Sequence, residues 1–123
     1  MKYFISVALF VSIIFIQPGC KSVVDDIIDC SVESGFLSIH ADVNAVNPKL
    51  VNFEFVNNDK ESGFTLDSDI QWDFGDGNTV TSTNHKTEHI YADSGDYKVK
   101  AGYTLRRGDA TCTGTKEKDI VIN

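Results

Sequence analysis

The chain has 123 residues, which is enough for one small domain with a single two-layer core. It carries 18 Asp and Glu against 11 Lys and Arg, so its formal net charge is −7. A surface of that sign repels phosphate groups, and the sequence contains no basic stripe interleaved with aromatic residues. Composition therefore argues against a nucleic acid partner and against charge-driven binding to anionic lipids.

The amino terminus has the pattern of an export signal. Lys2 precedes an apolar run over residues 3–16, and a small-residue exit follows, ending at Cys20. The run is shorter than the ~20 residues of a membrane span. Because the exit is Gly-Cys, residues 1–19 resemble a bacterial lipoprotein signal, after which Cys20 becomes the lipid-modified first residue. Gln17 departs from that pattern, so ordinary secretion with Cys20 as a free thiol stays open as the alternative.

Residues 20–29 show no turn or core pattern, so we expect a tether between the lipid and a domain at residues 30–123. The acyl chains on Cys20 would then be the membrane contact. The expected location is the bacterial cell envelope, with the lipid anchor in the outer membrane or at the cell surface.

Apolar and polar residues alternate along most of the remaining chain, which predicts β-strands. Pro48 breaks the pattern, because proline is excluded from a central strand, and a long polar loop is expected over residues 57–69. The seven expected strands cover residues 36–43, 51–55, 70–74, 78–82, 87–91, 97–105 and 111–122. Short strands at regular spacing predict an all-β Greek-key sandwich.

Three short motifs say more about the fold. Residues 72–77 read WDFGDG, residues 89–91 read HIY and residues 95–99 read GDYKV. Trp72 and Phe74 share one face of a strand, and the Gly-Asp-Gly that follows stops it. A Trp on a central strand, and on a later strand a Tyr two places before a buried small residue, are typical of immunoglobulin-like sandwiches.

In this order and spacing, the motifs resemble the polycystic kidney disease (PKD) domain, a small β-sandwich common in bacterial surface and secreted proteins. The resemblance covers roughly residues 30–123. It implies an immunoglobulin-like fold and a module that acts without catalysis, as a spacer, in adhesion or in binding. The residues that carry the resemblance are Trp72, Asp73, Phe74, Gly75, Asp76, Gly77, His89, Tyr91, Gly95, Tyr97 and Val99.

Strand direction in such a sandwich assigns the loops to two ends. The tether, Phe64 and the turn at residues 106–109 are expected at the membrane-facing end. The turn at residues 75–78, the corner at residues 92–96 and the carboxyl terminus are expected at the opposite, outer end. An isolated Phe in a loop either covers the core or is exposed for ligand stacking, and we favour a covering role for Phe64.

Within the core and corner, we expect Trp72 to be almost fully buried against Val99. We expect the Tyr97 hydroxyl to bond backbone near Asp93.

Polar residues at the outer end are the candidate site. Asn78, Asp93 and Asp96 are the candidate binding residues, because exposed turns on a rigid scaffold are common binding positions. Asp73, Asp76, Asp93 and Asp96 could supply carboxylates to Ca²⁺, but the Asp-x-Asp-x-Asp-Gly loop with its distal Glu is missing from the sequence. The alternative is that Asp76 and Asp93 bond turn amides while the other two carboxylates are solvated. We predict no dedicated metal site and no cofactor.

Other reactive residue types form no catalytic pattern. His40, His85 and His89 lack the i, i+4 pairing of helical zinc sites, and no nucleophile elbow surrounds Ser94. The tripeptide Arg-Gly-Asp at residues 107–109 is read by integrins, yet it also suits a tight turn, here on the membrane-facing side. The chain is therefore not expected to be an enzyme.

Cys30 and Cys112 are predicted to form a disulfide. Cys30 would open the first strand and Cys112 lies just past the turn at residues 106–109, so both belong to the membrane-facing end. In this architecture the first and last strands can run side by side. With Cys20 acylated, the remaining cysteines make an even count in an oxidising compartment.

Two functions remain open at this point. The first is recognition of a glycan or protein partner by the outer turns or a sheet face. The second is a structural, accessory subunit of an envelope complex that has no ligand site of its own.

Overall fold

In a computed structural model of the protein, residues 30–123 are described; the predicted signal, the lipidation site Cys20 and the tether lie outside the described residues. Within residues 30–123, no helix is long and apolar enough to cross a membrane. A short helix covers residues 30–34, and the rest is strand and loop. The strands are β1 (Leu37–Val43), β2 (Leu50–Asn57), β3 (Thr65–Leu66), β4 (Ile70–Asp73), β5 (Thr79–Ser82), β6 (Lys86–Ile90), β7 (Gly95–Arg107) and β8 (Ala110–Ile122).

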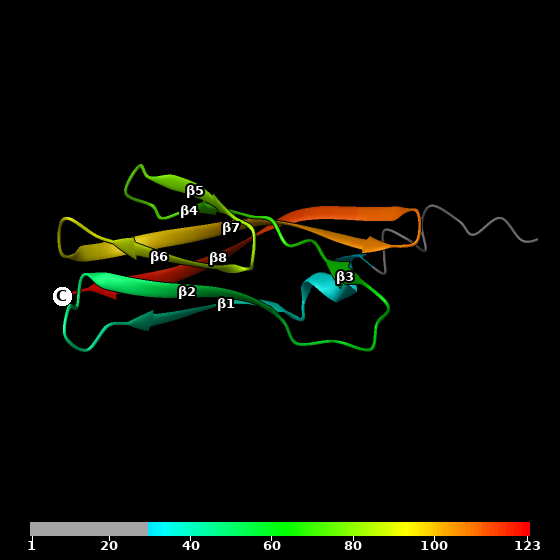
Figure 1. The fold of residues 1–123 in the computed structure, drawn as a ribbon, viewed down its shortest axis with the longest axis horizontal. Helices are drawn as coiled ribbons and strands as arrows, with labels where there is room; N and C mark the ends of the chain where they lie inside the picture. The colour runs from blue at the N-terminus through cyan, green and yellow to red at the C-terminus, as the bar shows by residue number, and fades with distance from the viewer. Residues whose placement is uncertain (1–29) are drawn as a thin grey trace, which may run out of the picture.

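The strands form two antiparallel sheets that face each other (Figure 1). One sheet has the order β1-β2-β6, and the other has the order β3-β7-β4-β5, with β8 paired to β7. In each sheet, strands that are distant in the sequence lie side by side: β2 pairs with β6, and β4 pairs with β7. This Greek-key connection confirms the predicted immunoglobulin-like sandwich.

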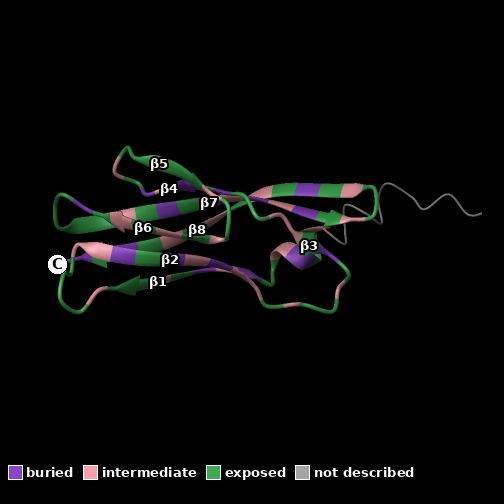
Figure 2. Ribbon diagram, in the orientation of Figure 1, coloured by how far each residue is buried: buried purple, intermediate pink, exposed green. Residues whose placement is uncertain are grey.

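The core lies between the sheets, where alternate residues of each strand point inward. On β2, Val51, Phe53 and Phe55 are buried while Asn52 and Glu54 face outward, and the same alternation is visible as purple bands in Figure 2. The buried hydrophobic residues of the core are Leu37, Ile39, Val51, Phe53, Phe55, Phe64, Ile70, Trp72, Phe74, Tyr91, Val99, Ala101, Tyr103, Leu105, Cys112, Ile120 and Ile122.

Trp72 is the largest fully buried side chain, with 1% of its surface exposed. Its ring centroid lies 5.8 Å from that of Phe53 and 6.4 Å from that of Phe55, both on the opposite sheet. The indole Nε1 donates to the Ser82 hydroxyl at 2.9 Å, so burial leaves its one polar atom satisfied. Val99 is also fully buried, although the residue directly across from Trp72 on β7 is Ala101.

The observed strands differ from the predicted ones in two places. The count is eight and not about seven, because the two-residue β3 pairs with Arg106 and Leu105 of β7. Two residues cannot show an alternation, so no sequence pattern marks β3. Cys30 does not open the first strand: residues 30–34 are helical, and β1 begins at Leu37.

Long-range contacts hold together the end of the domain that the sequence predicts to face the membrane. The Cys30–Cys112 disulfide is present, with Cα atoms 6.0 Å apart, and it ties the helix to the start of β8. Phe64 is buried, and the Arg107 guanidinium lies 4.4 Å from its ring centroid, which confirms its covering role. The helix also contributes Glu33, which is buried and accepts a hydrogen bond from Asn57 Nδ2 at 3.0 Å.

Candidate functional site

The site is built around the turn that joins β4 to β5. Asp73 Oδ1 accepts a hydrogen bond from the Gly75 amide at 2.9 Å, and the Phe74 amide donates to the Asn78 carbonyl at 3.1 Å. Gly75 has φ +79°, and a Cβ there would lie 2.6 Å from the Lys98 carbonyl oxygen on β7. A side chain at this position would therefore push two backbone segments apart, which explains the glycine.

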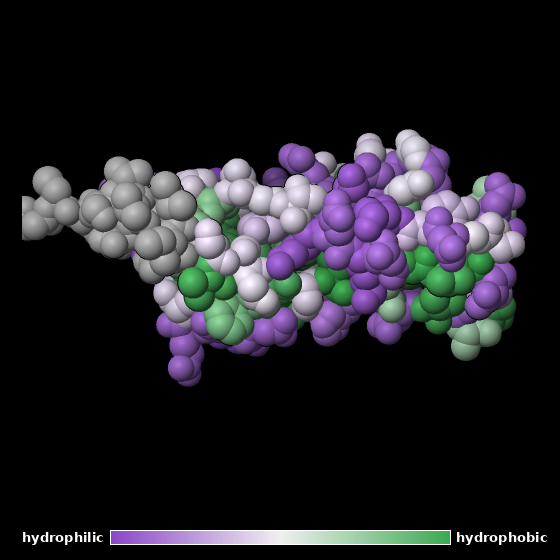
Figure 3. Space-filling view, turned by 180° about the vertical axis from the view of Figure 1, so that it is seen from behind, coloured by the Kyte–Doolittle hydropathy of each residue, from purple (hydrophilic) through white to green (hydrophobic). Residues whose placement is uncertain are grey.

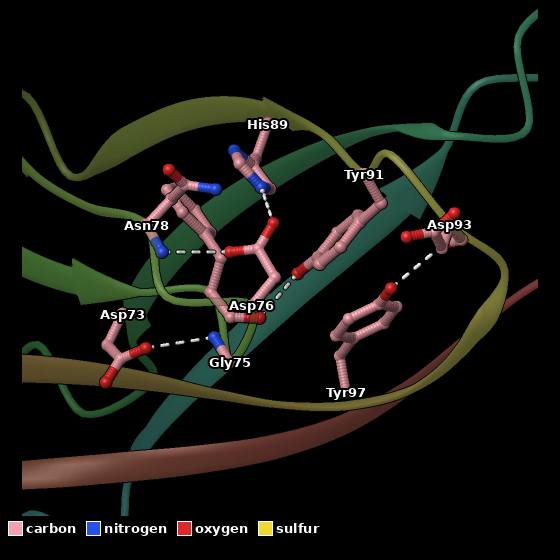
Figure 4. A network of polar contacts seen from close by, with 9 residues as sticks. Asp73, Gly75, Asp76, Asn78, His89, Tyr91, Asp93 and Tyr97 are labelled. Carbon is pink, nitrogen blue, oxygen red and sulfur yellow. Dashed lines mark hydrogen bonds and ion pairs between the residues drawn. The ribbon is translucent and has the colours of Figure 1, made fainter.

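Asp76 connects this turn to β6. Its Oδ2 lies 2.7 Å from His89 Nε2, and its Oδ1 accepts the Asn78 amide at 3.1 Å (Figure 4). Burial raises the pKa of the Asp76 carboxyl, but hydrogen bonds from His89 and from Asn78 outweigh it and leave that pKa below its usual value. The carboxylate is thus already occupied as a structural acceptor.

Two aromatic rings, Phe74 and Tyr91, support the Asp76–His89 contact. The His89 ring is stacked on Phe74 with centroids 4.0 Å apart, and it meets Tyr91 edge-on at 4.7 Å. The buried Tyr91 hydroxyl donates to the Phe74 carbonyl at 3.0 Å. Burial, with smaller effects from Asp76, Tyr97 and Asp73, raises the pKa of Tyr91 well above its usual value, so the phenol remains a donor.

The corner after β6 completes the outer end. The Tyr97 hydroxyl donates to the Asp93 carbonyl at 2.9 Å, which confirms the predicted corner hydrogen bond. The Tyr91 amide donates to the Lys49 carbonyl at 2.9 Å, and Lys49 Nζ donates to the Ala92 carbonyl. These bonds join the corner to the loop between β1 and β2, so three loops form one connected surface.

The candidate binding residues lie on this surface. Asn78, Asp93 and Asp96 are all exposed, in the β4–β5 turn, the corner and the start of β7 respectively. Asn78 and Asp93 contribute backbone oxygens to the turns while their side chains reach solvent. Their positions suit recognition, and binding by them remains a prediction.

The calcium candidates are not brought together as a metal site. No group of three or more His, Cys, Asp or Glu side chains that could hold a metal ion occurs among residues 30–123. Asp73 bonds the Gly75 amide and Asp76 bonds His89, so two of the four predicted carboxylates serve the turn. Asp76 bonds a turn amide as the alternative interpretation expected, but the second carboxylate to do so is Asp73 and not Asp93.

The remaining reactive residues are dispersed. His85 Nε2 lies 2.8 Å from the Asp67 carbonyl oxygen, and His85 itself has φ +63°, which ends the turn before β6. His40 is exposed on β1 opposite Glu54, and Ser94 is exposed in the corner. Arg107 ends β7, and Gly108 and Asp109 of the Arg-Gly-Asp tripeptide form the β7–β8 turn, with Gly108 at φ +58°. The turn conformation accounts for the tripeptide without a receptor.

One set of outer-end residues was not singled out by the sequence patterns. Val46 is 94% exposed in the β1–β2 loop, and Ile90 is 61% exposed at the end of β6. A valine in the loop between Asn44 and Asn47, shortly before Pro48, is the sequence signal for Val46. Ile90 follows Lys86 and Glu88 at alternate positions, so the strand alternation places its side chain on the solvent-facing side.

The fold agrees with a comparison against family models, in which the PKD domain model matches residues 37–120. The chain belongs to the PKD domain family. Among solved structures, the PKD1 domain of the Vibrio cholerae metalloprotease PrtV is similar, with 21% identity and a TM-score of 0.52, over 71% of this chain and 94% of that one. The PKD1 domain of Vibrio anguillarum Epp shows 19% identity and a TM-score of 0.46, over 71% and 93%.

No curated protein sequence matches this chain. The Vibrio cholerae structure, at 21% identity, supports the fold alone, so the partner of this PKD domain is argued from its own surface.

Proposed function

We propose that the protein is a lipid-anchored component of the bacterial cell envelope, whose PKD domain acts without catalysis by binding a glycan or protein partner at its outer end. Cys20 would carry the lipid, and residues 20–29 would join it to the domain. Asn78, Asp93 and Asp96 would contribute to the contact, with no cofactor and no nucleic acid involved.

The observation that carries this proposal is that the start of the PKD domain and its candidate binding turns lie at opposite ends. The described chain begins at Cys30, beside Cys112 and the β7–β8 turn, whereas the β4–β5 turn and the corner lie at the far end (Figure 1). A tether attached at Cys30 would leave the far end pointing away from the lipid. A rigid network of turns in that position favours recognition, since binding residues are commonly held on loops by a fixed scaffold.

Surface shape favours a broad contact over a small-molecule pocket. Two adjoining grooves of about 470 and 540 Å³ run over the outer face of β4, β7 and β8 and share Gln71, Gly102 and Thr115. Both grooves are open to solvent and lined mainly by polar residues, unlike the enclosed, largely apolar sites of most enzymes. The same shape is compatible with the second candidate, an accessory subunit that docks onto a larger envelope protein.

The anchor is tested by labelling cells with radioactive palmitate. Wild-type protein is expected to incorporate the label and to fractionate with membranes, while Cys20→Ser is expected to lose both properties and still fold. Failure of the wild-type protein to take up palmitate would leave ordinary secretion as the better description.

Recognition is tested with the purified domain on a glycan array and by isolation of complexes from envelopes. Asn78→Ala and Asp96→Ala should each weaken the contact, because both side chains are exposed at the outer end. His40→Ala is the matched control, since His40 is exposed on the outer face of β1. If His40→Ala weakens binding and the outer variants do not, the contact lies on the sheet face.

A further inference from the structure

Exposed apolar side chains gather at the outer end of the domain. Val43 is 49% exposed at the end of β1, Val46 is 94% exposed in the loop that follows, and Ile90 is 61% exposed at the end of β6. Figure 3 shows hydrophobic atoms at the end opposite the grey ones, bordered by hydrophilic atoms. Leu50 and Ile90 are register partners on the outward face of the β1-β2-β6 sheet, whereas Val43 pairs with the buried Val51 and belongs to the inner face. We call Val46, Ile90 and the half-buried Leu50 the apical surface.

Backbone contacts hold the apical surface in one place. Leu50 pairs directly with Ile90, and the Asn44 amide, next to Val43, donates to the Leu50 carbonyl at 2.8 Å. Asn44 Oδ1 accepts hydrogen bonds from the amides of Val46 and Asn47, each at 2.9 Å. Val46 therefore projects from a loop whose conformation is already set, which lowers the entropy cost of using it in a contact.

The rim of the apical surface is acidic. Asp42 and Glu88 both pair with Asn52, in the row next to Leu50 and Ile90 on the same sheet face, and Asp93 follows Ile90 in the corner. None of these three side chains forms an ion pair within residues 30–123. The nearby cation, Lys49, is directed at the Ala92 carbonyl. On the strands, by contrast, several acidic and basic side chains are matched in ion pairs.

Two ion pairs illustrate that matching. Lys98 Nζ lies 3.0 Å from Asp119, and Lys86 Nζ lies 3.3 Å from Glu54. The unpaired acidic side chains at the outer end thus give it a locally negative field.

From this combination we infer that the apical surface docks a protein partner whose contact patch is apolar at its centre and carries Lys and Arg around it. The inference rests on the proposed function and names the chemistry of the partner. Apolar side chains at the centre would supply affinity, and the acidic rim would select and orient a basic surface.

Charge disfavours the other occupants. A second copy of this chain would bring two acidic rims together, and an anionic lipid surface would be repelled by the same carboxylates. Glycan contacts usually include an aromatic ring for stacking, whereas Val46, Leu50 and Ile90 offer aliphatic groups alone. A basic protein surface is the occupant that satisfies both the apolar centre and the charged rim.

The test is site-specific photo-crosslinking of the full-length chain in intact envelopes. A photoreactive amino acid is placed at Val46 and, as the matched control, at Val32, which is 59% exposed in the helix at the opposite end. The expected result is a discrete crosslinked protein from position 46 and not from position 32. The crosslinked peptide of that protein should contain Lys or Arg beside apolar residues.

Charge and apolar contacts are separated with further variants in the same background. Asp42→Lys with Asp93→Lys should lower the crosslink yield about tenfold or more, as should high salt, since both remove the electrostatic attraction. Ile90→Asp should lower it as well, while Val32→Asp should not. Circular dichroism and thermal unfolding verify that each variant is folded.

Several results would overturn the inference. A crosslinked species of twice the chain's own mass would identify a second copy, and crosslinking to phospholipid would identify a membrane. A partner crosslink unaffected by the charge reversals and by Ile90→Asp would also contradict it. If a partner is isolated with the wild-type protein but never crosslinks at position 46, the proposed function stands and the apical surface is wrong. If no partner or glycan is found by any route, both fail.

Discussion

The two ends of the sandwich are stabilised in different ways. At the outer end, short-range hydrogen bonds shape the individual turns: Asp73 bonds Gly75, Asp76 bonds Asn78, and Tyr97 bonds the Asp93 carbonyl, each pair within four residues. Longer-range hydrogen bonds, such as those of Asp76 with His89 and of Lys49 with Ala92, then join these turns without a covalent link. At the opposite end, the Cys30–Cys112 disulfide closes a sequence separation of 82 residues. Short sequence motifs thus form one end, while the other depends on a covalent link between distant segments.

This difference has a consequence for function. An end made of local hydrogen bonds can vary its exposed side chains, such as Asn78 and Asp96, without disturbing the backbone bonds of the turns. An end closed by a disulfide instead resists being pulled open at the point where the chain leaves the domain. The arrangement suits a module tethered at one end and binding at the other.

The largest expected effect on the free energy of unfolding comes from a substitution in the core, on which both ends of the domain depend. Trp72→Ala should lower the free energy of unfolding by ~3–5 kcal/mol, because it removes a fully buried ring packed on Phe53 and Phe55. Hydrogen exchange should show that amides at both ends lose protection together. Loss of protection at one end alone would mean that the sandwich is not a single cooperative unit.

Removing the disulfide should act mainly on one end. Cys30→Ser with Cys112→Ser should cost about 4 kcal/mol on the chain-entropy model, because the unfolded chain regains the freedom of a long loop. Amides of residues 30–34 and of the β7–β8 turn should exchange faster, while those of the β4–β5 turn change little. Two free thiols in mass spectra of the non-reduced wild-type protein would contradict the link.

At the outer end, two glycines form a matched pair. Gly75 and Gly77 both have positive φ, but a Cβ at Gly77 meets no atom within 4 Å, whereas one at Gly75 meets the Lys98 backbone. Gly77→Ala should cost ~1–2 kcal/mol from backbone strain alone. Gly75→Ala should cost about 3 kcal/mol, since overpacking against β7 is added. Equal costs, measured by denaturant unfolding, would show that β7 yields easily at Lys98.

The smallest expected effect is on acid stability. The pKa of Asp76 is lower in the folded protein than in the unfolded chain, so its contribution is complete above its usual pKa and is lost as pH falls through the folded value. Asp76→Asn should therefore reduce the loss of unfolding free energy between about pH 5 and pH 2. Asp93→Asn is the control, because no hydrogen bond is formed by its carboxylate within residues 30–123. A wild-type pH profile in Asp76→Asn would contradict the prediction.

Much of the fold is determined by local sequence. Alternation along β2 and β7, the Gly-Asp-Gly stop after Trp72 and the corner Tyr97 predict strands, turn and sandwich, because each depends on residues within a few positions of one another. The pairing of Cys30 with Cys112 was predictable too, from two cysteines assigned to the same end of a known architecture.

Tertiary structure alone decided the rest. β3 exists because β7 offers a partner, Gly75 is required because Lys98 crosses beside it, and Asp76 is occupied because the fold brings His89 within reach. In each case the deciding atom lies well away in the sequence. The apical surface has the same origin, since Leu50 and Ile90 become neighbours only when β2 pairs with β6. A periodic pattern records which face a residue occupies, and long-range packing determines what covers that face.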